Sequence, residues 1–320
     1  MANIFRWITR LMPVWVVLAG VVGYLCPPTL TIFEPIKDWL FAFTMLGIGI
    51  VLKSEDFLPI LKAPHWVVMG TLAQFVIMPL LGFLIAKGLE LPPDLAIGVI
   101  MVGAVPGAMA SNVISYIAEA DVAYSVALTT TTTLLSPILT PLCTYILGSV
   151  YVSVPFLPML WSIIKMVILP LLIGFALRYL LKERVEVVVD VFPALSALCI
   201  AFICGLVVAL NAGSLKQVSL IIFVAVFLHN LLGLILGYAA GILFRFDVKR
   251  RRTLAFEVGM QNAGLGAVLS LKHFSAQSAL PNALFATWCI ITASLLAGYW
   301  KWRKNNIKSE PDSAGMEEKV

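Results

Sequence analysis

The sequence predicts an all-α polytopic membrane protein with ten transmembrane helices. Hydrophobic residues make up 61% of the 320 residues and charged residues only 12%, whereas soluble proteins typically contain about 25% charged residues. The mean hydropathy is +0.99, and long apolar runs alternate with short charged clusters. Lipid therefore surrounds most of the chain, which excludes soluble globular, disordered and collagen-like classes.

Ten apolar runs are long enough to cross a bilayer, because about 20 helical residues span a hydrocarbon core of about 30 Å. No small-x-small cleavage site follows the first run, so we expect a retained helix rather than a secretory signal peptide. The approximate boundaries of the runs are 12–27, 36–52, 64–86, 94–118, 122–149, 157–181, 189–210, 217–244, 253–271 and 282–300.

The distribution of Lys and Arg predicts the orientation, because cytoplasmic loops hold the excess of positive charge. With a cytoplasmic N-terminus, seventeen of the 22 Lys and Arg fall on the cytoplasmic side and four on the other side. We therefore expect an even number of spans and both termini in the cytoplasm. The net charge of +5 does not indicate nucleic acid as a partner, since the cations lie between apolar runs.

A weak internal repeat relates the two halves of the chain. Residues 100–116 align with residues 256–272, and each segment contains a Val-Gly pair. We expect a first five-span repeat over residues 1–150, a second over 151–305 and a polar C-terminal tail over 306–320. Because five is odd, the second repeat would enter the membrane in the opposite orientation, as in many secondary transporters.

Polar and helix-breaking residues concentrate in the fourth and ninth runs, which are the repeat mates. Pro106 removes an amide donor and, with Gly107, loosens the fourth helix, while the glycine-rich and amide-rich segment 259–266 does the same in the ninth. We predict that both helices break and cross near the midplane, presenting half-helix N-termini and unwound carbonyls. A plain proline kink is the alternative for the fourth run.

Seven polar side chains within the runs are candidate cation ligands. They are hard oxygen ligands with one formal negative charge, a set that favours Na⁺ over Ca²⁺ or Mg²⁺. The alternatives are a protonated or snorkelling carboxyl for Glu257 and an interhelical hydrogen bond for Gln74. We interpret His229 and Asn230 as a structural hydrogen-bonding pair. The seven candidates are Gln74, Ser111, Asn112, Ser125, Thr129, Glu257 and Gln261.

Four segments give the chain a family likeness: GAVPGAMASNVISYIAEADVAYSVALTT (103–130), FEVGMQNAGLGA (256–267), AQF (73–75) and LHN (228–230). They resemble the bile acid/sodium symporter family in its bacterial branch. The resemblance covers nearly the whole chain. It implies ten helices in two inverted five-helix repeats, with a panel domain of spans 1, 2, 6 and 7 and a core domain of spans 3–5 and 8–10.

The resemblance also implies two sodium sites, and every side chain that they require is present. The first site would use Ser111, Asn112, Ser125, Thr129 and Glu257. The second would use Gln74, Glu257, Gln261 and the backbone carbonyls of Val258 and Met260.

The substrate side matches the family less well. Bacterial relatives often have Thr at the position of Met109 and Trp-His-Asn where this chain has Trp288, Cys289 and Ile290. The expected cavity therefore lacks two polar groups, while Asn262 is kept for contact with a carboxylate. Relatives carry bile acids, steroid sulfates, pyruvate, or pantoate and ketopantoate, and here we expect a small carboxylate rather than a bile acid.

The expected function is sodium-coupled uptake of a small organic anion by alternating access, in a monomer of the bacterial inner membrane. Two Na⁺ with the carboxylate of Glu257 leave a charge of +1, which would attract the anion. The alternatives are proton coupling through Glu257, a channel, or a membrane enzyme. No catalytic dyad or metal-ligand spacing supports the enzyme.

Overall fold

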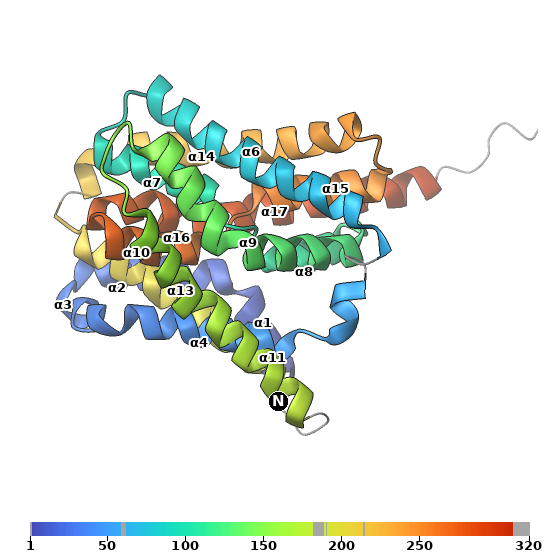
Figure 1. The fold of residues 1–320 in the computed structure, drawn as a ribbon, viewed down its shortest axis with the longest axis horizontal. Helices are drawn as coiled ribbons and strands as arrows, with labels where there is room; N and C mark the ends of the chain where they lie inside the picture. Colours follow the sequence, from blue (N-terminus) through green and yellow to red (C-terminus); the bar gives the residue numbers. More distant parts are fainter. Residues whose placement is uncertain (1, 59–61, 182–188, 190, 214, 310–320) are drawn as a thin grey trace, which may run out of the picture.

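The chain folds into a bundle of helices (Figure 1). All regular elements in the part of the chain described here are helical, in agreement with the predicted all-α class. The computed structural model describes residues 2–58, 62–181, 189, 191–213 and 215–309. Of the predicted tail, residues 310–320 lie outside this part.

Each of the ten predicted runs coincides with one helix or with adjoining helical segments. The first half contains α1 (Ala2–Arg10), α2 (Met12–Leu25), α3 (Pro28–Thr31), η1 (Glu34–Ile36), α4 (Lys37–Val51), η2 (Ser54–Phe57), α6 (Pro64–Gly88), α7 (Pro93–Ala104), α8 (Ala110–Ile117) and α9 (Val122–Gly148). The second half contains α10 (Phe156–Ile163), the π-helix η3 (Ile164–Ile168), α11 (Leu169–Leu181), α13 (Val191–Leu210), α14 (Leu215–Leu243), α15 (Val248–Gly259), α16 (Ala263–His273) and α17 (Ala276–Ser309).

Local signals explain where several of these helices begin. Pro64 and Pro93 occupy the first positions of α6 and α7, where a backbone N–H has no intrahelical partner. Asp121 caps α9 by accepting a hydrogen bond from the amide of Tyr124 at 3.0 Å. Asp247 caps α15 in the same way, with the amide of Lys249 at 2.9 Å.

The outer surface of the bundle is apolar. On α6, Val68, Leu72 and Val76 follow one another at intervals of four residues, and each is at least 50% exposed. Such a stripe suits lipid, and the chain is an integral membrane protein. Among the described residues, six helical segments are long and apolar enough to span a bilayer: Pro64–Gly88, Val122–Gly148, Phe156–Leu181, Val191–Leu210, Leu220–Leu243 and Ala276–Arg303.

The fourth and ninth runs are both interrupted, as the sequence predicts. The fourth is divided into α7 and α8 by residues 105–109, and the ninth into α15 and α16 by residues 260–262. The two interruptions lie against each other, because Gly107 and Gln261 form an antiparallel bridge. The amide of Ala108 donates to the carbonyl of Met260 at 3.0 Å. We call the two interruptions, residues 105–109 and 260–262, together the crossing.

Glycines allow close packing between helices of the two halves. The α2 and α13 helices are neighbours, as are α4 and α11. A Cβ on Gly23 of α2 would lie 2.3 Å from the carbonyl oxygen of Gly205 on α13, and one on Gly49 of α4 would lie 2.1 Å from that of Leu171 on α11. A larger residue would force each pair apart.

Candidate functional site

Glu257 lies near the end of α15, beside the crossing, and is only 2% exposed. The hydroxyl of Ser111 on α8 donates to its Oε1, and the hydroxyl of Ser125 on α9 donates to the same oxygen at 2.5 Å. Thr129 Oγ1, one turn along α9, lies 3.0 Å from each carboxylate oxygen. Three hydroxyls from two other helices therefore surround one buried carboxylate.

Asn112 completes this group, with its Oδ1 at 3.3 Å from Thr129 Oγ1. Ser111 and Asn112 lie in the first turn of α8, which begins at Ala110 directly after the interruption of the fourth run. The structure thus brings together all five residues of the first predicted sodium set. Hydroxyl oxygens both donate and accept, so the groups that now donate to the carboxylate can also offer lone pairs to a cation.

Gln74 and Gln261 form a second polar group at the crossing. Gln74 donates from Nε2 to Oε1 of Gln261 at 2.7 Å and to the carbonyl of Val105 at 3.3 Å. Gln261 donates from Nε2 to the carbonyl of Val258 at 2.6 Å. Both glutamines are buried, and Oε1 of Gln74 has no hydrogen-bond partner among the described residues. Gln74 on α6 therefore bonds to both interruptions, and one of its partners is another candidate ligand.

Gly107 brings the backbone of the crossing against Glu257. A Cβ at position 107 would lie 2.9 Å from Oε2 of Glu257 and 3.4 Å from its carbonyl oxygen. Any larger residue would displace the carboxylate or the backbone, so glycine is required here for close approach. The interruption of the fourth run therefore positions Glu257 as well as breaking a helix.

Of the residues predicted on the substrate side, Met109 and Asn262 belong to the two interruptions, and Cys289 lies beside one of them. Asn262 caps α16, since its Oδ1 accepts from the amide of Leu265 at 3.2 Å. Met109 immediately precedes α8 and is half-buried, as is Ile290 on α17. Cys289 is buried, and its thiol lies close to the backbone of Gln261.

Asn230 on α14 also supports the crossing. It donates from Nδ2 to the carbonyl of Gly259 at 2.8 Å, where α15 ends, and accepts at Oδ1 from the hydroxyl of Thr292 at 2.6 Å. His229 binds the carbonyl of Met78 at 2.9 Å. Each residue thus binds a backbone carbonyl elsewhere in the fold, whereas the sequence analysis expects a hydrogen-bonding pair. Their partners depend on tertiary packing, which the LHN segment alone does not reveal.

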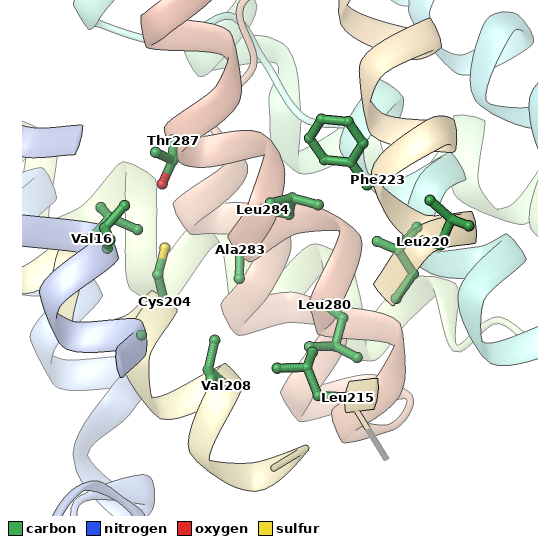
Figure 2. Close-up of a pocket in the computed structure, with 13 residues that line it drawn as sticks. Val16, Cys204, Val208, Leu215, Leu220, Phe223, Leu280, Ala283, Leu284 and Thr287 are labelled. Carbon is green, nitrogen blue, oxygen red and sulfur yellow. The ribbon is translucent and has the colours of Figure 1, made fainter. Parts of the chain in front are cut away.

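An apolar cavity of approximately 530 Å³ lies between α2, α13, α14 and α17. Figure 2 shows Val16 from α2, Cys204 from α13, Phe223 from α14, and Ala283 and Thr287 from α17 around it. Its wall is mainly aliphatic, with Phe223 as the aromatic side chain among the lining residues. The sequence analysis does not identify this cavity, because its lining comes from four distant segments and carries no polar motif.

A model of the sodium bile acid symporter family matches residues 39–218. The chain belongs to this family. It is 38% identical over 303 residues to the "Uncharacterized sodium-dependent transporter YocS" of Bacillus subtilis, with 95% of this chain and 94% of that protein covered. It is 36% identical to the "Probable sodium/metabolite cotransporter BASS1, chloroplastic" of Arabidopsis thaliana, with 92% of this chain and 74% of that protein covered.

Similarity extends to the human "Ileal sodium/bile acid cotransporter", which is 29% identical over 247 residues, or 74% of this chain and 69% of that protein. These relatives are named as transporters or cotransporters and not as enzymes. The bacterial and chloroplast matches agree with the resemblance to the bacterial branch, and the predicted class of membrane transporter is confirmed.

Proposed function

We propose that this protein is a symporter that couples Na⁺ entry to uptake of a small organic anion by alternating access. Pantoate, ketopantoate or another monocarboxylate is the expected cargo, and a bile-acid-like anion is the second class. The observation that carries the proposal is the buried carboxylate of Glu257 among the hydroxyls of Ser111, Ser125 and Thr129. An anionic group needs compensation in a membrane interior, and Na⁺ suits these hard oxygens.

The first sodium ion would take oxygens from the five residues of the Glu257 group. A second would take Oε1 of Gln74, which accepts no hydrogen bond from the described residues, together with Glu257 and Gln261. The carbonyls of Val258 and Met260 already accept one hydrogen bond each. Each carbonyl oxygen has a second lone pair that can serve a cation.

The cargo would bind where the charge of the crossing is positive. Two Na⁺ and one carboxylate leave +1, and the N-termini of α8 and α16 add partial positive charge at the same place. Asn262 would contact the carboxylate of the cargo, while Met109, Cys289 and Ile290 give its surroundings less polar character. These residues favour a compact anion with few hydroxyl groups.

Alternating access requires two parts that move relative to each other. We infer two inverted five-helix repeats over residues 1–150 and 151–305, with ten spans, both termini in the cytoplasm and a monomer in the bacterial inner membrane. The moving core would contain α6–α9 and α14–α17, and the panel would contain α2, α4, α10, α11 and α13. Lys272 of α16 binds Asp38 of α4 at 2.5 Å, so an ion pair joins core to panel.

Uptake into proteoliposomes tests the proposal. A panel of small carboxylates is first screened for stabilisation of the purified protein in sodium, which selects a cargo. An inward sodium gradient should then drive uptake of this cargo. The Glu257→Ala variant should fold and insert into the membrane but show no sodium-driven uptake. Uptake driven by a pH gradient without sodium would instead support proton coupling, and sodium-driven uptake by Glu257→Ala would overturn the proposed site.

A further inference from the structure

We propose that Thr253 is a positioning residue that aligns the three helices of the Glu257 group and thereby sets the affinity for sodium. This inference rests on the proposed function. The hydroxyl of Thr253, on α15, accepts a hydrogen bond from the backbone amide of Asp121 at 3.0 Å and donates one to its carbonyl at 3.0 Å. Thr253 is completely buried.

The position of this contact relates it to the sodium site. Thr253 precedes Glu257 by four residues on α15, and Asp121 precedes Ser125 by four residues at the start of α9. Four residues make about one helical turn, or about 6 Å. The Thr253–Asp121 contact therefore lies one turn from the bond between Ser125 and Glu257 on the same two helices.

The backbone at Asp121 is also tied to α8. The turn over residues 118–121 joins α8, which carries Ser111 and Asn112, to α9, which carries Ser125 and Thr129. Thr253 thus holds the junction of two ligand-bearing helices against the third, which carries Glu257. A shift of α15 by a fraction of a turn would separate the carboxylate from all three hydroxyls.

Neighbouring contacts support the junction but have less influence on its geometry. Arg250 pairs with the carboxylate of Asp121 at 3.2 Å, and Arg252 donates to the carbonyl of Ala118 at 3.2 Å. Arginine side chains are long, and Arg250 is partly exposed. Thr253 has a short side chain and binds two backbone atoms of one residue, which leaves it little freedom to adjust.

A comparable contact at another turn of the core provides a control. The hydroxyl of Ser275, in the turn between α16 and α17, donates to Oδ1 of Asp94 at the start of α7 at 2.7 Å. This bond also fastens the start of an interrupted helix to a turn, but neither residue contacts the Glu257 group. Its removal should affect stability and leave the affinity for sodium unchanged.

The test measures thermal stability of the full-length protein in detergent against NaCl, with KCl at matched ionic strength, and sodium alone as the probe. For Thr253→Val we expect the sodium concentration at half-maximal stabilisation to rise about ten-fold, because one well-aligned contact is lost. Thr253→Ser keeps the hydroxyl and should stay within about two-fold of the wild type. Ser275→Ala should keep the wild-type sodium concentration.

Thr253→Ala removes the hydroxyl together with the methyl group of the threonine. It replaces Thr253→Val in the test if that variant does not fold. An unchanged sodium concentration in the variants lacking the hydroxyl would overturn this inference alone. An equal change in Thr253→Ser, or in Ser275→Ala, would assign the effect to general loss of stability and also overturn it. Absence of a sodium-specific effect in the wild type would overturn the proposed function first, and this inference with it.

Discussion

The carbonyl of Pro106 accepts a hydrogen bond from the backbone amide of Asn262 at 2.8 Å. One residue breaks the fourth apolar run and the other caps the helix that resumes the ninth. Together with the bond from Ala108 to Met260, this contact satisfies backbone groups that two interrupted helices leave unpaired in a membrane. It also places the half-helices that carry Ser111 and Glu257 beside each other.

The first prediction compares two serines one turn apart on α8. Ser111 donates to Glu257, whereas Ser115 bonds to Ser125 at 3.3 Å and is not among the groups that contact the carboxylate. Ser111→Ala should raise the sodium concentration for half-maximal stabilisation about ten-fold, and Ser115→Ala should change it less than about two-fold. Equal effects in the two variants would show that contact with the carboxylate is not the cause.

The second prediction concerns Gln74. Gln74→Ala removes Oε1, which has no hydrogen-bond partner in the described part of the chain, and the bond to Gln261, but it leaves the Glu257 group intact. We expect weaker sodium dependence of uptake rather than its loss. Thr71→Val, at another buried position of α6, is the matched control and should retain wild-type dependence. Wild-type sodium dependence in Gln74→Ala would return Gln74 to a purely structural role.

The third prediction separates support of the crossing from sodium binding. Asn230→Leu leaves the buried carbonyl of Gly259 without its side-chain donor, which should lower the free energy of unfolding by about 1–3 kcal/mol. Denaturation in detergent measures this change. Thr292→Val keeps that donor and should have a smaller effect, so equal losses in the two variants would contradict the role assigned to the amide of Asn230.

The fourth prediction tests movement between core and panel. Bridging Asp38→Cys to Lys272→Cys with a short bifunctional maleimide should stop uptake, because the proposed alternating access moves α4 and α16 relative to each other. The control bridges Asp94→Cys to Ser275→Cys, two positions within the proposed core, and should leave uptake unchanged. Both pairs are made with Cys26→Ser, since Cys26 is exposed. Full uptake by the first bridged pair would contradict alternating access between these parts.

The sequence predicts the helices well because a membrane-spanning helix is specified by apolar length. The interruptions are also predictable, since Pro106 and the glycines near residue 259 weaken helices locally. The π-helix at Ile164–Ile168 is not predicted, because hydrophobic periodicity over this run does not distinguish a π-helical turn from an α-helical one. The α17 helix also extends beyond the predicted run, to Ser309, since polar residues can continue a helix outside the apolar region.

The candidate site, like the fold, is predictable from the sequence only in part. Glu257, Ser111 and Gln74 can be identified as candidates from the sequence, because an oxygen-bearing side chain inside an apolar run is costly in lipid without a partner. Their partners follow from how helices pack in three dimensions. The contact of Thr253 with Asp121 joins residues 132 positions apart in the chain. Asp121 lies within the segment 103–130, but Thr253 lies outside all four segments that carry the family likeness.

The most direct test of the central claim is thermal stability of the detergent-purified protein against NaCl, with KCl or choline chloride at matched ionic strength. A ligand that binds only the folded state raises the melting temperature as its concentration passes Kd. We predict stabilisation specific to sodium in the wild type and its loss in Glu257→Ala. Equal stabilisation by sodium and potassium, or a sodium effect that persists in Glu257→Ala, would contradict the assignment of Glu257 as the sodium ligand.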